Sequence, residues 1–442
     1  MAAMEPHPIR LVVHDDLERS RLTVFFRLLL AIPHLIWLSL WSFIALLFIA
    51  PITWIATLVS GKAPQSLWDF YCSLVRYATH VYAYVLLAAD PFPGFTGKAG
   101  SYPIDLEIDP PGRQNRWKTA FRIVLALPAL LLTSVLFGGQ GGGGGSSGGT
   151  SQSAGEEFGY YLSAPGVTFA VAVLAWFACM VRARMPNGFR DLLAYALRYG
   201  AQTWGYLLFL TDRYPDSDPR EPAPTPPPYR PVALTSEEDD LRRSRLTVFF
   251  RLLLAIPHLI WLFLWTIAAF FALVAGWFAA LALGRLPNAL HRFLAAYLRY
   301  STHVFAFLYL VSNPFPGFAG TAGSYPVDVR IDPPERQSRW TVLFRLLLGF
   351  PAFVVDSALT GALGVAAFLG WFAALVTGRM PRGLRGLGAY ALGYTAQTYG
   401  YASLLTARYP YSGPPGIDVE APPEEEPEPA WPGVSPSPSL HW

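Results

Sequence analysis

A stripe of polar residues recurs at helical spacing in four mostly apolar segments, and its residue types could carry protons or hold a ligand. Two segments place a histidine four residues after an arginine, and the other two place a glutamine at the histidine position. Residues four apart share one face of a helix, and histidine changes its charge near neutral pH. The stripe consists of Arg76, His80, Arg198, Gln202, Arg299, His303 and Gln397.

Two interpretations of this stripe are open. A helix at the membrane interface carries arginines whose charged ends reach the headgroups and tyrosines that form a belt, and we favour this interpretation. The alternative is a functional polar lining in which His80 and His303 carry protons or contact a ligand.

Other catalytic or metal chemistry is not indicated. No carboxylate stands at ligand spacing beside the histidines of the stripe, so a metal site is not expected. The two cysteines, Cys72 and Cys179, cannot form a disulfide framework or a cysteine metal cluster. The chain lacks the phosphate-binding, nucleophile-elbow, zinc-protease and CxxC motifs. We therefore expect no enzyme activity, no metal and no cofactor.

Four arginines occupy one position in four related segments, about one turn inside an apolar helix. A guanidinium at the bilayer centre costs about 3 kcal/mol or more, but near a helix end it reaches lipid headgroups. We favour contacts with lipid phosphates, and the alternative is ion pairing with carboxylates of predicted strands, such as Asp109 and Asp332. The arginines are Arg27, Arg122, Arg251 and Arg345.

The composition is that of an integral membrane protein. Charged residues make up 14% of the chain and hydrophobic residues 53%, and the mean hydropathy is +0.33. A soluble domain has about 25% charged residues. The net charge of +3 is too small to indicate a nucleic-acid partner, so membrane lipids are the expected partners.

The elements that position these residues are repeated four times, in the order A-B-A-B. The phrase SRLTVFFRLLLAIPHLIW at 20–37 returns at 244–261, and weaker copies begin at Arg116 and Arg339. The first A-B pair is predicted to occupy 1–214, with a Gly-rich insertion at 138–160, and the second pair 232–410. A stiff Pro-rich linker at 215–231 separates the pairs, and 411–442 is predicted to be a disordered acidic tail.

Each unit is predicted to contain a short strand, a long apolar run and a third helix. Residues 102–109 alternate between apolar and acidic, which indicates a strand, and four such strands could form one surface sheet. The apolar runs 28–59 and 252–283 are longer than one membrane crossing needs. Since the Gly-rich insertion cannot lie unsatisfied in lipid, we expect each run to be a transmembrane helical hairpin.

The basic residues predict the orientation of these hairpins. Arg and Lys flank both ends of each run, so the positive-inside rule places both ends and the amino terminus in the cytoplasm. A third crossing would invert the next unit and place its basic end outside. We therefore favour a third helix that is interfacial or re-entrant, and eight spans rather than twelve. The predicted fold is an all-α polytopic membrane protein with short surface β-strands.

The ordered motifs resemble a known family. The sequence FFRLLLAIPHLIW, a Trp-Phe-Ala stretch, GR-x-P and a helix closing in DRYP are similar to a bacterial membrane-protein family described only as a domain of unknown function. The resemblance covers nearly all of both halves. It implies a multi-pass location in the bacterial inner membrane and no catalytic residues.

Two functions from different classes are consistent with these observations. We prefer a non-enzymatic envelope scaffold or accessory protein whose cytoplasmic strands and acidic tail recruit a protein partner. The alternative is a transporter or channel lined by the polar stripe of the third helices. Substrate, partner identity and oligomeric state are not encoded in any motif of the chain.

Overall fold

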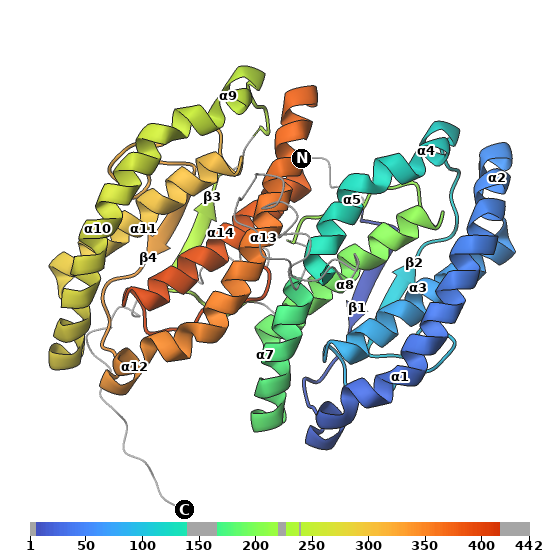
Figure 1. The fold of residues 1–442 in the computed structure, drawn as a ribbon, viewed down its shortest axis with the longest axis horizontal. Helices are drawn as coiled ribbons and strands as arrows, with labels where there is room; N and C mark the ends of the chain where they lie inside the picture. The colour runs from blue at the N-terminus through green and yellow to red at the C-terminus, as the bar shows by residue number, and fades with distance from the viewer. Residues whose placement is uncertain (1–5, 139–165, 220–226, 238–239, 416–442) are drawn as a thin grey trace, which may run out of the picture.

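The computed structural model describes residues 6–138, 166–219, 227–237 and 240–415, which form two lobes side by side (Figure 1). One lobe contains the residues of the first predicted A-B pair and the other those of the second. Most of the Gly-rich insertion at 138–160 and most of the acidic tail lie outside the described residues.

The first lobe contains two strands and the helices that surround them. Its A unit contains β1 (Ile9–Val13), α1 (Arg21–Ile44), the π-helical turn η1 (Ala45–Ile49), α2 (Ala50–Ser60) and α3 (Gln65–Val85). Its B unit contains β2 (Ile104–Ile108), α4 (Arg116–Ala120), α5 (Arg122–Phe137), α7 (Val167–Arg182) and α8 (Asn187–Leu207).

The second lobe repeats this order with longer uninterrupted helices. Its A unit contains β3 (Val232–Ser236), α9 (Arg245–Phe249), α10 (Arg251–Leu283) and α11 (Asn288–Leu308). Its B unit contains β4 (Val327–Ile331), α12 (Arg339–Leu343), α13 (Arg345–Thr377) and α14 (Arg382–Ala402). We call α3, α8, α11 and α14 the third helices, and α1–α2, α10 and α13 the long helices.

The long apolar runs are single helices, so the predicted hairpin is wrong in the three units where the run is described throughout. Helices α10 and α13 each continue for 33 residues, and Arg21–Ser60 forms 40 consecutive helical residues. These runs lack the Gly-rich insertion of the second unit, and an unbroken helix satisfies its backbone groups internally. Asp356 lies buried in the middle of α13 and accepts a hydrogen bond from Thr395 at 2.6 Å.

The number of candidate spans changes accordingly. In the described part of the chain, three helices are long and apolar enough to cross a membrane, rather than eight: Arg21–Ser60, Arg251–Leu283 and Arg345–Thr377. The third helices are not among them. Each is 21 residues long and packs along a long helix or its counterpart α5, so they lie inside the protein rather than flat beneath a bundle.

The strands form two separate pairs, not one four-stranded sheet. Strand β1 pairs antiparallel with β2, and β3 pairs antiparallel with β4. Leu11 stands opposite Leu106 in the first pair, and Leu234 opposite Val329 in the second. Each sheet buries this apolar side against third helices, as the alternating pattern predicts.

The A and B units of each lobe are interlocked because each third helix packs on the strand of the other unit. Helix α3 contacts β2 and α8 contacts β1, while α11 contacts β4 and α14 contacts β3. The units of each lobe are also linked at the ends of their apolar runs. A tryptophan indole near the end of one unit's run donates a hydrogen bond to a backbone carbonyl near the start of the other unit's run. The pairs are Trp54–Thr119 and Trp176–Val24 in one lobe, and Trp277–Val342 and Trp371–Val248 in the other, at 3.0–3.2 Å.

The two lobes meet through α13, which packs against α5 and α7. The segments that follow α8 and α14 also cross between the lobes. Tyr411 donates a hydrogen bond to Asp191 of α8 at 2.7 Å, and Ser217 lies against Gly383 at the start of α14. The first residues of the predicted linker and of the predicted tail therefore take part in packing.

An engineered disulfide tests the strand pairing. Arg10 and Glu107 are directly opposite on the outer side of the first sheet, and opposite residues have Cα atoms about 4.5–5.5 Å apart, within disulfide range. We expect Arg10→Cys/Glu107→Cys to cross-link fully on mild oxidation, as judged by peptide mass spectrometry. The matched pair Arg10→Cys/Arg330→Cys joins strands of different lobes, and efficient cross-linking of that pair would contradict two separate sheets.

Candidate functional site

In the A units, residues of the polar stripe form hydrogen bonds with the strands. Arg76 Nε donates to the Leu106 carbonyl at 3.1 Å, and Arg299 Nε donates to the Val329 carbonyl at 3.0 Å. Both carbonyls belong to the strand of the neighbouring B unit. An arginine on a third helix of an A unit thus takes the place of a neighbouring strand at the sheet edge.

His80 and His303 form buried pairs with strand carboxylates. His80 Nε2 lies 2.9 Å from Asp105, and His303 Nε2 lies 2.9 Å from Asp328. The other oxygen of each carboxylate accepts a backbone N–H, from Gly100 and Gly323 respectively. Each imidazole also packs on a tyrosine ring, with ring centroids 4.9 Å apart.

The environment of these carboxylates favours the charged form. Burial raises the pKa of Asp105, but hydrogen bonds from His80 and from the N–H groups of Leu106 and Gly100 outweigh burial, so the pKa lies below its ordinary value. Asp328 has a lowered pKa for the corresponding reasons. An ionised carboxylate accepts a hydrogen bond from the Nε2–H of the histidine. The pair therefore links the third helix to the strand.

In the B units, the glutamines of the stripe form hydrogen bonds with the backbone of neighbouring segments. Gln202 Nε2 donates to the Ile9 carbonyl of β1 at 3.0 Å, and its Oε1 accepts the Asp216 N–H at 2.9 Å. Gln397 Oε1 accepts the Tyr411 N–H at 3.1 Å. Arg198 donates to the Asp218 carbonyl. These side chains hold a strand and the segments that run back along the third helices.

The four buried arginines cap third helices rather than contacting lipid. Arg27 donates to the carbonyls of Tyr84 and Ala89, both at 2.8 Å, and to the Asp90 carboxylate at 2.6 Å. Each of these arginines is at most 2% exposed, and its guanidinium stacks on an aromatic ring at the end of the third helix that it caps. The equivalent backbone acceptors are Tyr206 and Thr211 for Arg122, Phe307 and Ser312 for Arg251, and Tyr401 and Thr406 for Arg345.

Both expectations for these arginines are therefore corrected. Phosphate contact is ruled out by their burial, and the strand carboxylates have other partners, because Asp109 pairs with Arg10 and Asp332 accepts from Tyr229. The physical reason is that carbonyls at a helix C-terminus retain acceptor capacity and carry partial negative charge, which attracts a cation. These carbonyls come from residues 56 to 89 positions away in the chain.

Sequence reasoning missed the aspartate partners of the two histidines. A recognisable signal was present, because Ser-Tyr-Pro-x-Asp occurs once at the start of each B unit, at 101–105 and 324–328, and histidine occurs in the stripe of both A units. The His34–Tyr77 and His258–Tyr300 pairs, at 2.8 and 2.9 Å, were also unexpected.

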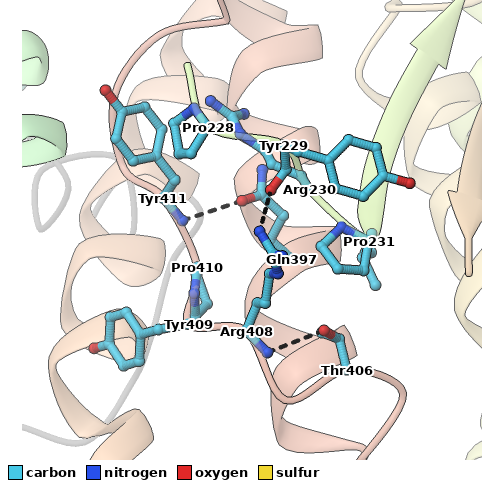
Figure 2. A pocket seen from close by; sticks show the side chains of 11 residues that line it. Pro228, Tyr229, Arg230, Pro231, Gln397, Thr406, Arg408, Tyr409, Pro410 and Tyr411 are labelled. Carbon is cyan, nitrogen blue, oxygen red and sulfur yellow. Dashed lines mark hydrogen bonds between the residues drawn. The ribbon is translucent and has the colours of Figure 1, made fainter. Parts of the chain in front are cut away.

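Two hollows lie away from the long helices. One of about 600 Å³ opens on the outer side of the β1–β2 sheet and includes Arg10, Arg76, Asp105 and Glu107. The other, of about 150 Å³, is lined by segments 228–232 and 406–411 with Gln397 (Figure 2). Neither brings the stripes of the four units together. Among the described residues, no group of three or more His, Cys, Asp or Glu could hold a metal ion.

Removing one arginine cap should destabilise the lobe that contains it. Arg345→Gln removes the guanidinium donor from the Thr406 carbonyl and Gln337 Oε1, and leaves the Tyr401 carbonyl with the Leu404 N–H. We expect a loss of about 3 kcal/mol. Exposed Arg339, which donates to Ala282 at 3.0 Å, supplies the control Arg339→Gln, with a change of less than about 0.5 kcal/mol.

Both native cysteines are buried, so a thiol-reactive dye reports unfolding of the detergent-solubilised protein. Equal melting temperatures for the two glutamine variants would contradict the capping role.

His7 should make stability depend on pH. It is buried, its Nδ1 accepts the Ile9 N–H at 3.0 Å, and burial lowers its pKa from 6.5 to about 4. The unfolded chain takes up a proton below pH 6.5 while the folded chain does not until about pH 4, so stability is lost as pH falls through that interval, by about 3 kcal/mol.

His7→Asn preserves an acceptor and removes the titration, so its melting temperature should fall less than that of wild type between pH 7 and pH 4. Exposed His14→Asn is the control. An unchanged pH slope in His7→Asn would refute this assignment.

Comparison with known proteins supports the resemblance noted from the motifs. A family model described as a domain of unknown function, DUF4389, matches residues 21–96, 162–217, 245–319 and 339–412. No curated protein and no solved structure matches the chain. The four matches cover more than half of the chain and fall on its four units. The chain therefore belongs to the DUF4389 family and contains four copies of its domain.

Proposed function

We propose that this chain is a non-enzymatic scaffold or accessory protein embedded in the bacterial inner membrane. The observation that carries the proposal is that the polar residues of the third helices and the apolar residues of the long helices have different roles. The stripe residues of the third helices serve internal ties, whereas the long helices expose large apolar side chains such as Leu252, Phe263 and Phe271. Apolar surface on this scale is stable only against lipid or another protein.

The outer sides of the two sheets are the parts available to a partner. The first carries Arg10, Glu107 and Asp109, which form ion pairs at 2.9–3.4 Å and remain partly exposed. Polar, partly exposed strands next to an open hollow are suited to contact with a soluble protein. We propose that this side faces the cytoplasm, together with the amino terminus and the acidic tail.

A transporter is the less supported alternative. Transport of protons needs titratable groups that exchange with water on both sides, and His80 and His303 are each about 1% exposed and already paired with aspartate. The two hollows described above each contain members of the stripe from one unit only. We therefore assign His80 and His303 a structural role.

A flux measurement separates these functions. Proteoliposomes loaded with a pH-sensitive dye should show the same proton leak as empty liposomes, both for wild type and for His80→Ala/His303→Ala, because the histidines hold strands and line no route. A protonophore added at the end verifies the dye, and exposed His14→Ala is the matched variant. Proton flux that is present in wild type and absent only from the double variant would favour the transporter.

A further inference from the structure

We propose that the long helices lie in the plane of the membrane, within one leaflet, instead of crossing it. The protein would then be held in the bilayer from one side, with its sheets facing water. This inference rests on the membrane attachment in the proposed function and specifies its geometry. Three observations carry it: the length of the helices, the level of the sheets along them, and the charges at their ends.

The long helices do not fit a bilayer by length. Helices α10 and α13 contain 33 residues each, which corresponds to about 50 Å at about 1.5 Å per residue. The hydrocarbon core is about 30 Å thick. A crossing without mismatch would require a tilt of about 50°, beyond the range of about 0–40° found for membrane-spanning helices. Arg21–Ser60, with 40 consecutive helical residues, is longer still.

Side-chain bonds place the sheets beside the middle of the long helices, not beyond their ends. Tyr300 pairs with His258 of α10 at 2.9 Å, and the adjacent Arg299 donates to Val329 of β4 at 3.0 Å. His258 is nine residues from residue 267, the midpoint of α10, a separation of about 14 Å along the axis. The first lobe has the equivalent bonds, His34–Tyr77 and Arg76–Leu106, and His34 is six or seven residues, about 10 Å, from the middle of Arg21–Ser60. Figure 1 shows both sheets at this intermediate level.

A crossing orientation would therefore submerge the sheets in hydrocarbon. The half-thickness of the core is about 15 Å, so strands at the level of these bonds, about 10–14 Å from the middle, lie inside it. Two-stranded sheets have open edges, and lipid cannot satisfy their backbone groups. The outer side of the first sheet also carries Glu107, whose side chain is 61% exposed. A charge that exposed is incompatible with the bilayer interior.

The charges at the helix ends support the same orientation. Exposed basic residues stand at both ends of each long helix: Arg21 and Lys62 for α1–α2, Arg245 and Arg285 for α10, and Arg339 and Arg379 for α13. A crossing helix follows the positive-inside rule with one basic end. A helix in the plane of the membrane keeps both ends at headgroup depth, where each cation reaches lipid phosphates.

The surface of the helices completes the argument. The buried residues of α10 form a narrow stripe that includes Arg251, Ala255, His258, Leu262 and Ala269, and the rest of its circumference exposes apolar side chains. The third helices lie between the long helices and the strands. An in-plane helix with this pattern sinks its apolar arc into the acyl chains and keeps its stripe on the protein.

Double labelling of intact protein tests the orientation. Ser244→Cys and Asn288→Cys are exposed positions at opposite ends of α10, and they are combined in one chain with Cys72→Ala and Cys179→Ala. Sealed proteoliposomes are treated with a membrane-impermeant maleimide and analysed by intact mass. We expect molecules that face outward to be labelled at both cysteines and molecules that face inward to be labelled at neither. A crossing helix exposes one site on each side, so a singly labelled population would overturn the inference.

A depth measurement provides an independent readout. Leu252, Phe263 and Phe270 lie on the same exposed arc of α10, and spin labels at these positions should report one common depth by oxygen and nickel relaxation. A minimum of water exposure at Phe263 with shallower ends would contradict the in-plane orientation. Alkaline carbonate extraction separates the two proposals, because release of the protein would refute membrane embedding itself, whereas retention with single labelling refutes only the orientation.

Discussion

The structure depends on reciprocal contacts between neighbouring units. The third helix of each unit packs on the strand of the other unit and forms hydrogen bonds with it. A two-stranded sheet has few backbone partners and is only marginally stable alone. Arg76, His80 and Gln202 supply bonds from helices to strand atoms, and the indoles of Trp54 and Trp176 fix the ends of the apolar runs reciprocally. Each strand therefore depends on the other unit of its lobe for these bonds.

These reciprocal contacts explain why polar residues recur in a chain of such high hydropathy. A buried guanidinium or imidazole is costly unless hydrogen bonds and opposite charges compensate for its burial. Arg27 and its three equivalents meet helix C-terminal carbonyls and aromatic rings, and the two histidines meet aspartates. The polar groups of the repeat thus hold the apolar helices in a rigid frame, which suits a scaffold better than a conduit.

Much of the local structure could be predicted from the sequence. The repeat order, the strand at 104–108 and the third helices follow from periodicity and motif spacing, and the family resemblance is confirmed. The hairpin was wrong because the Gly-rich insertion of one unit was taken as evidence for units that lack such an insertion. The partners of Arg27, His80 and Gln202 could not be predicted, because they lie on other elements and no periodicity encodes which units exchange strands.

Hydrogen exchange of the intact protein in lipid nanodiscs tests these reciprocal contacts most directly. Amides of β1 and β2 are predicted to share slow, cooperative exchange with α3 and α8, because the two units of a lobe open only together. The same joint protection is expected for β3 and β4 with α11 and α14. Rapid exchange of the strands while the third helices stay protected would contradict the account.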